Sequence, residues 1–96
     1  MNAYLLVFDD SQIAREVITR KLDMIPAIQN WFAFLSNTVS LVSIKDARSI
    51  SDLVREAFPE LRFIVVEIDR DKKGGYLPKS VWEFINRPSP AESSAA

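Results

Sequence analysis

The sequence contains no cysteine and no histidine among its 96 residues. Without cysteine the chain forms neither a disulfide framework nor a thiolate metal site. Without histidine it lacks the commonest general base and the commonest zinc ligand. Catalysis would therefore fall to carboxylates, and a bound metal would be a hard cation held through oxygen atoms.

Long apolar runs and a charge excess of one sign are also absent. No run approaches the roughly 18 apolar residues that cross a bilayer, and the start of the chain has no basic stretch followed by an apolar one. We therefore expect no membrane segment, no signal peptide and a cytoplasmic location. The net charge of −1 gives no basic bias of the kind that nucleic-acid-binding domains carry.

What is present suits one small globular domain, with 48% hydrophobic and 26% charged residues. Runs rich in β-forming residues predict four strands. These strands are expected over residues 3–8, 31–35, 39–44 and 62–69. Ser36-Asn37-Thr38 is the predicted turn between the second and third strands.

Helical periodicity predicts three helices. The first is expected over residues 11–24, because Pro26 cannot continue it. The second is expected to start at Ser49, with Ser49-Ile50-Ser51-Asp52 as a capping box, and to end before Pro59. A short third helix is expected over residues 79–86.

The predicted order, strand–helix–strand–strand–helix–strand with a terminal helix, is that of the α+β, ferredoxin-like βαββαβ fold. Right-handed crossovers give an antiparallel sheet of strand order 4-1-3-2, with the two main helices on one face. We expect one domain over residues 1–86. Residues 87–96 offer little to bury and are expected to form a disordered tail.

Both faces of the predicted sheet are apolar. Alternate residues of the first strand form two apolar sets, which are Tyr4, Leu6 and Phe8, and Ala3, Leu5 and Val7. Two helices cover one face only, so the second face needs either the third helix alone or that helix together with a second copy of the chain. We favour the homodimer. The residues expected at its interface are Trp31, Phe32, Phe34 and Trp82.

Two adjacent carboxylates end the first strand. The predicted topology brings this end beside the start of the third strand and the start of the fourth. The residues expected to meet there are Asp9, Asp10, Ser36, Asn37, Thr38 and Arg62. Such a set suits a hydrated Mg²⁺ and a phosphate oxygen. The alternative is that the aspartates only end the strand and cap the next helix.

Four strings resemble, in order and layout, the CRISPR-associated endonuclease of the adaptation complex and its stand-alone SinR-like relatives. They are "LLVFDD", "FAFLSNTVSLVS", "RFIVVEID" and "GGYLPKSVWEFI", and the resemblance covers about residues 3–86. It implies a homodimer formed through the sheet, with a strand-end Asp from each protomer sharing Mg²⁺ or Mn²⁺. By position that role falls on Asp9, with Asp10 as the alternate. Val39 replaces an aromatic residue often found after the hairpin turn, and basic residues are sparse.

Two functions follow from these observations. The first is a metal-dependent endonuclease, active or vestigial, with Asp9 and Asp10 as catalytic residues. Its expected nucleic-acid contacts are Ser36, Asn37, Thr38 and Arg62. The second is a non-enzymatic dimerisation or protein-interaction module, for instance in a toxin–antitoxin or defence locus. The charge balance favours the second function, and the placement of the aspartates together with the resemblance favours the first.

Overall fold

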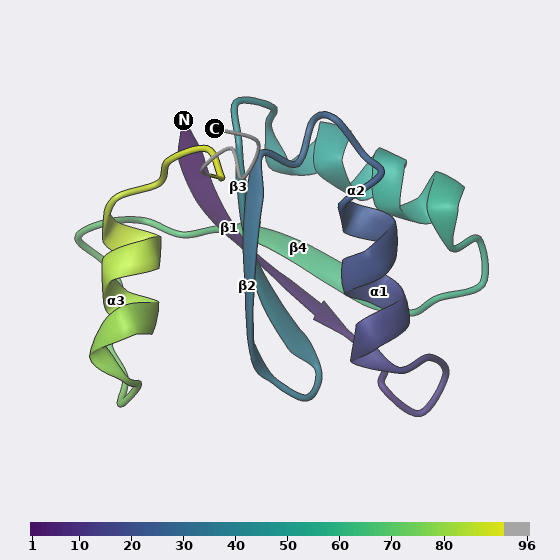
Figure 1. Ribbon diagram of the computed structural model, residues 1–96, viewed down its shortest axis with the longest axis horizontal. Helices are drawn as coiled ribbons and strands as arrows, with labels where there is room; N and C mark the ends of the chain where they lie inside the picture. Colours follow the sequence, from purple (N-terminus) through teal and green to yellow (C-terminus); the bar gives the residue numbers. More distant parts are fainter. Residues whose placement is uncertain (92–96) are drawn as a thin grey trace.

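The computed structural model describes residues 1–91 as four strands and three helices (Figure 1). In chain order these are β1 (Asn2–Phe8), α1 (Arg15–Leu22), β2 (Asn30–Leu35), β3 (Thr38–Ser43), α2 (Ala47–Ala57), β4 (Phe63–Glu67) and α3 (Lys79–Asn86). The strands form one antiparallel sheet in the order β2-β3-β1-β4. This is the predicted order 4-1-3-2 counted from the opposite edge, so the α+β, ferredoxin-like arrangement is confirmed.

The main core lies between the sheet and the helices α1 and α2, which Figure 1 shows on one side of the sheet. Apolar side chains at alternate strand positions meet the apolar stripes of both helices, as the periodicities predict. The buried residues of this core are Tyr4, Leu6, Phe8, Ile18, Leu22, Ile28, Val39, Leu41, Ile50 and Val54.

Strand β3 lies between β1 and β2 and is buried at all six of its positions. Its three polar side chains are nevertheless hydrogen-bonded. The hydroxyl of Ser43 donates to the carbonyl oxygen of Ala27 at 2.7 Å, and that of Ser40 donates to the carbonyl oxygen of Phe32 at 3.2 Å. The hydroxyl of Thr38 donates to Asn37 at 3.0 Å. The buried polar groups therefore have their partners and do not weaken the strand.

Both main helices begin at positions other than those predicted. Helix α1 begins at Arg15 and not at residue 11, because residues 11 and 12 form a turn with Asp9. Helix α2 begins at Ala47, and its cap is Asp46, whose carboxylate accepts from the amide of Ser49 at 2.8 Å. The predicted capping box at Ser49 is therefore wrong, because an acceptor three residues earlier takes that amide. The longest helix, α2, has 11 residues, and no helix in residues 1–91 is long and apolar enough to cross a membrane.

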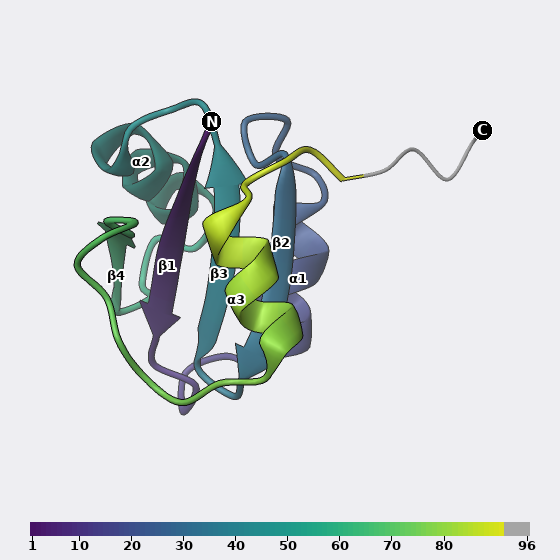
Figure 2. The same ribbon diagram turned by 90° about the vertical axis from the view of Figure 1, so that its left-hand side faces the viewer.

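Helix α3 covers part of the second sheet face, as Figure 2 shows, where it lies over β2 and β3. Its buried residues Val81 and Ile85 pack with Ala3 of β1 and against Phe32 and Phe34 of β2. The rings of Phe32 and Phe84 meet edge to face, with centroids 5.6 Å apart. On the same face, Leu5 and Val7 of β1 and Ile64 and Val66 of β4 lie outside this cluster and are at least partly exposed.

Residues 87–91 leave α3 and reach the start of β2. The amide of Ala91 donates to the carbonyl oxygen of Gln29 at 2.8 Å, and the side-chain amide of Asn30 donates to the carbonyl oxygen of Ser89 at 3.3 Å. The first residues of the predicted disordered tail thus contact the sheet. The prediction for residues 92–96 lies outside the described residues.

Replacing Tyr4 tests how much the hydrogen bond between β1 and the segment before α2 contributes to the free energy of unfolding. The Tyr4 side chain is fully buried, and its hydroxyl donates to the carbonyl oxygen of Lys45. Tyr4→Phe leaves that carbonyl without this donor, so we expect the free energy of unfolding in urea to fall by about 1–2 kcal/mol. Tyr76→Phe is the control, because Tyr76 is fully exposed. An equal change in both variants would contradict a stabilising role for the hydrogen bond between Tyr4 and Lys45.

Candidate functional site

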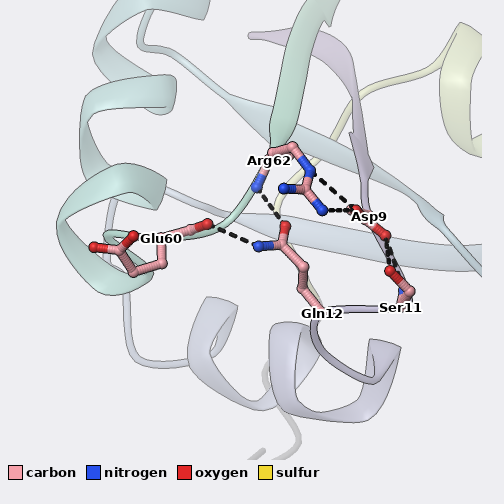
Figure 3. A network of polar contacts seen from close by, with 5 residues as sticks. All are labelled: Asp9, Ser11, Gln12, Glu60 and Arg62. Carbon is pink, nitrogen blue, oxygen red and sulfur yellow. Dashed lines mark hydrogen bonds and ion pairs between the residues drawn. The ribbon is translucent and has the colours of Figure 1, made fainter.

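The carboxylate of Asp9 is fully engaged by two neighbours (Figure 3). Its Oδ1 atom accepts hydrogen bonds from the amide of Ser11 at 3.0 Å and from the hydroxyl of Ser11 at 2.6 Å. Its Oδ2 atom accepts from Nε and Nη2 of Arg62, at 3.1 and 2.6 Å. Both carboxylate oxygens therefore already have partners within the chain.

Strand pairing places Asp9 and Arg62 side by side. The two residues directly extend the β1–β4 ladder, and the amide of Asp9 donates to the carbonyl oxygen of Arg62 at 2.9 Å. Gln12 adds a second connection between the same two loops. Its side-chain nitrogen donates to the carbonyl oxygen of Glu60 at 2.9 Å, and its side-chain oxygen accepts from the amide of Arg62 at 2.7 Å (Figure 3). Loop residues 9–12 and 60–62 are thus fastened together.

This environment keeps Asp9 ionised. The hydroxyl of Ser11, the guanidinium of Arg62 and the amide of Ser11 together lower the pKa of Asp9 from its usual 3.8 to about 2. A general base works best when its pKa lies near the working pH, so a carboxylate with such a low pKa is a poor proton acceptor at neutral pH. The arrangement suits an ion pair that anchors two loops.

The other predicted site residues lie around the same end of β1 but on its other side. Asp10 and Ser36 line a shallow cleft of about 490 Å³ together with Arg15, whose guanidinium donates to the carbonyl oxygen of Leu35 at 3.0 Å. The carbonyl oxygen of Asn37 accepts from the amide of Phe8 at 3.0 Å. Thr38 is buried and bonded to Asn37. The predicted cluster therefore divides into an Asp9–Arg62 pair and a separate Asp10–Ser36 cleft.

The described residues of a single chain do not fit a Mg²⁺ or Mn²⁺ centre at Asp9. Both of its oxygens already have partners, and one of these is a guanidinium that a cation would have to displace. Within residues 1–91 no three metal-ligating side chains of the acidic, His or Cys types come together. A centre shared between two copies of the chain stays a prediction.

Sequence reasoning missed Ser11 and Gln12, which were placed inside the first helix. Ser11 had a usable signal, because an Asp two residues before a small polar residue favours an Asx turn over helix. Gln12 had none, since its partners Glu60 and Arg62 are about 50 residues away in the sequence.

The four predicted interface residues do not share one surface. Trp31 packs against the main core, and its indole nitrogen donates to Asp23 at 2.6 Å. Phe32 and Phe34 lie beneath α3 on the other face. Trp82 lies on α3 itself and lines a cleft beside it. The β2 aromatics therefore serve mainly to hold the helices against both faces of the sheet.

Comparison of the chain with protein-family models, with curated proteins and with solved structures gives no significant match. The resemblance to the CRISPR-associated endonuclease and its SinR-like relatives stays a hypothesis. The function of the site is therefore argued from its geometry.

Asp9→Asn should make the protein less stable at neutral pH. Because the pKa of Asp9 is lowered in the folded state, its contribution to stability is present above the usual value of 3.8 and is lost as the pH falls toward 2. The variant should therefore lack this part of the acid dependence in unfolding measurements across that range. Asp10→Asn is the matched control, since the Asp10 carboxylate is exposed. Parallel pH profiles of wild type and Asp9→Asn would refute the ion-pair role.

Adding Mn²⁺ or Mg²⁺ distinguishes the ion pair from a shared metal centre. We expect no change in the melting temperature of the wild type, because both oxygens of Asp9 are occupied. A metal-dependent rise in the wild type that Asp9→Asn abolishes would instead support the endonuclease hypothesis, since a ligand that binds only the folded state stabilises it by mass action.

Proposed function

We propose that the protein is a non-enzymatic self-association module that docks through the uncovered part of its second sheet face. The observation that carries this proposal is an apolar patch made of two cross-strand pairs, Leu5 with Val66 and Val7 with Ile64. We call these four residues the β1–β4 patch. Ile64 and Val66 are 57% and 40% exposed, and Leu5 and Val7 are partly exposed.

A second copy of the chain is the partner that suits this patch best. Its four side chains carry no charge or hydrogen-bonding group, so the patch offers nothing for a charged partner to recognise. A two-fold axis would set the patch against itself, and an apolar surface is complementary to its own copy. Two sheets packed face to face in this way lie about 10 Å apart, with their side chains interdigitated.

The size of the patch predicts a weak dimer. Burying each of these partly exposed aliphatic side chains contributes about 1 kcal/mol, and thus about 8 kcal/mol for two copies. Association costs at least about 4 kcal/mol in lost translational and rotational freedom. With that lower cost, the difference of about 4 kcal/mol corresponds to a dissociation constant of about 1 mM.

The metal-dependent endonuclease is the alternative function. One observation favours it. Asp9 directly follows β1, so it lies at one end of the strand pair that carries the β1–β4 patch. A two-fold axis near this end would bring the two Asp9 carboxylates together, and a shared divalent cation would then have to replace Arg62 in each copy. We rank this function second because Asp9 is already paired and the chain has a net charge of −1.

Ile64→Glu should weaken self-association at least tenfold, because burying a carboxylate without a partner costs several kcal/mol. Sedimentation measurements from about 10 μM to about 1 mM cover the expected range of dissociation constants. Ile44→Glu is the matched control, because Ile44 is 68% exposed but lies outside the patch, between β3 and α2. A wild type that stays monomeric at the highest concentration, or equal effects of both substitutions, would overturn the proposal.

A further inference from the structure

The two edge strands of the sheet, β2 and β4, differ in how well residues 1–91 protect them; Figure 2 shows them on opposite sides of the sheet. The ladder of β2 has a register shift between Ala33 and Leu35. The guanidinium of Arg15 donates to the carbonyl oxygen of Leu35, and residues 87–91 contact the other end of the strand. A bulge and covering contacts of this kind hinder the addition of another strand.

Strand β4 has no such protection in the described chain. Its residues, Phe63–Glu67, include no proline and no lysine, and they pair with β1 without a register shift. A regular apolar edge of this kind is a template for another strand. A groove of about 610 Å³ lies between α2 and the first residues of β4, and its lining residues on α2 are Ser51, Asp52 and Arg55.

The pairing with β1 shows which backbone groups of β4 point away from the sheet. At the start of β4 the amide of Asp9 donates to the carbonyl oxygen of Arg62, and at its end the amide of Ile68 donates to β1. In an antiparallel ladder, residues that bond the partner strand alternate with residues whose backbone groups point away. The even-numbered residues from 62 to 68 therefore face β1. The outward residues are Phe63, Val65 and Glu67, and their backbone groups have no hydrogen bond within residues 1–91.

We propose that this edge is a second self-association surface, on which β4 of another copy adds antiparallel and makes one continuous sheet. The inference goes beyond the proposed function, because the edge and the β1–β4 patch are different surfaces. A two-fold axis at Val65 sets this residue opposite itself and sets Phe63 opposite Glu67 of the second copy. That register engages every outward amide and carbonyl of both strands in about six hydrogen bonds.

The side chains across this axis are compatible on both faces of the sheet. Residues opposite each other in an antiparallel pair lie on the same face. On the second face, Ile64 meets Val66 of the second copy, so the two β1–β4 patches become one continuous apolar strip. On the helix face, Val65 meets its own copy. A strand of the same sequence therefore places apolar side chains against apolar ones throughout the centre of the pair.

The remaining pair, Phe63 with Glu67 of the second copy, brings opposite charges together. Arg55 and Phe63 line the same groove, and Arg55 forms no ion pair within residues 1–91. Glu67 is exposed on the helix face, where its carboxylate lies 3.4 Å from the hydroxyl of Tyr4. Edge pairing sets Glu67 of the second copy beside Arg55, and the two-fold axis repeats this contact. Such complementarity favours a second copy over an unrelated peptide.

Amide hydrogen exchange, followed by NMR, tests the edge separately from the patch. Between about 0.05 and about 1 mM chain, exchange at the three outward residues should slow about two- to fivefold, because their amides are bonded only in the pair. The amides of Ile64 and Val66 face β1 and should change little. Docking through the patch alone would instead shift the methyl signals of Leu5 and Val7, without this alternation along β4.

A charge reversal tests the register. Arg55→Glu should weaken edge pairing about tenfold, because it sets two carboxylates near each other on both sides of the axis. Adding Glu67→Arg should restore the affinity to within about threefold of the wild type. Arg20→Glu is the matched control, because Arg20 lies in the last turn of α1, as Arg55 does in α2, and is exposed outside the groove.

Several outcomes would overturn the proposal. Exchange at the outward residues that does not depend on concentration would do so, whether it is fast or slow throughout, and so would equal effects of Arg55→Glu and Arg20→Glu. Concentration-dependent sedimentation without the alternating pattern would remove the edge pairing and leave docking through the β1–β4 patch in place. Equal protection by an unrelated extended peptide of alternating Thr and Val would replace the second copy by a general strand partner.

Discussion

Strand β1 is apolar on both of its faces, and most of the architecture follows from the need to cover them. Its hydrogen-bonding edges are both occupied, because β1 pairs with β3 on one side and with β4 on the other. One of its faces is covered by α1 and α2. On the other face, α3 covers Ala3 but leaves Leu5 and Val7 partly exposed. The second layer and the β1–β4 patch are therefore two consequences of the same apolar strand.

The sequence was sufficient to predict the strands and the helical stripes, which depend on apolar periodicity and on the positions of proline. The strand order then follows from right-handed crossovers. The sequence was insufficient to predict the residues at which α1 and α2 begin. Asp46 and Ser49 both suit a helix N-terminus, and only the hydrogen bond between them shows which one caps α2. The start of α1 depends on Gln12, whose partners belong to a loop about 50 residues further along the chain. The turn of Asp9 with Ser11 has a local signal, but no local pattern contains the contacts of Gln12.

The candidate site was predictable in position but not in chemistry. Antiparallel pairing places the end of β1 beside the start of β4 and the hairpin turn, so the meeting of Asp9 with Arg62 could be anticipated. The sequence could not show that Arg62 would use its guanidinium on Asp9 itself and not on a phosphate. That choice depends on side-chain geometry and on Ser11, which fixes the orientation of the carboxylate. Likewise, the sequence put Trp31, Phe32 and Phe34 together at the expected interface, and it did not show that only Phe32 and Phe34 would lie beneath α3.

The complete burial of β3 implies that different parts of the molecule open at different rates. Because β3 is enclosed by β1, β2 and both layers, its amide protons exchange with solvent only when the whole sheet separates. Helix α3 has eight residues and no side-chain cap at Pro78, and it is joined to the sheet by a small apolar cluster. We therefore expect α3 to open at a lower free energy than the sheet. Such a partly open state would uncover Phe32 and Phe34 and so enlarge the exposed apolar area of the second sheet face.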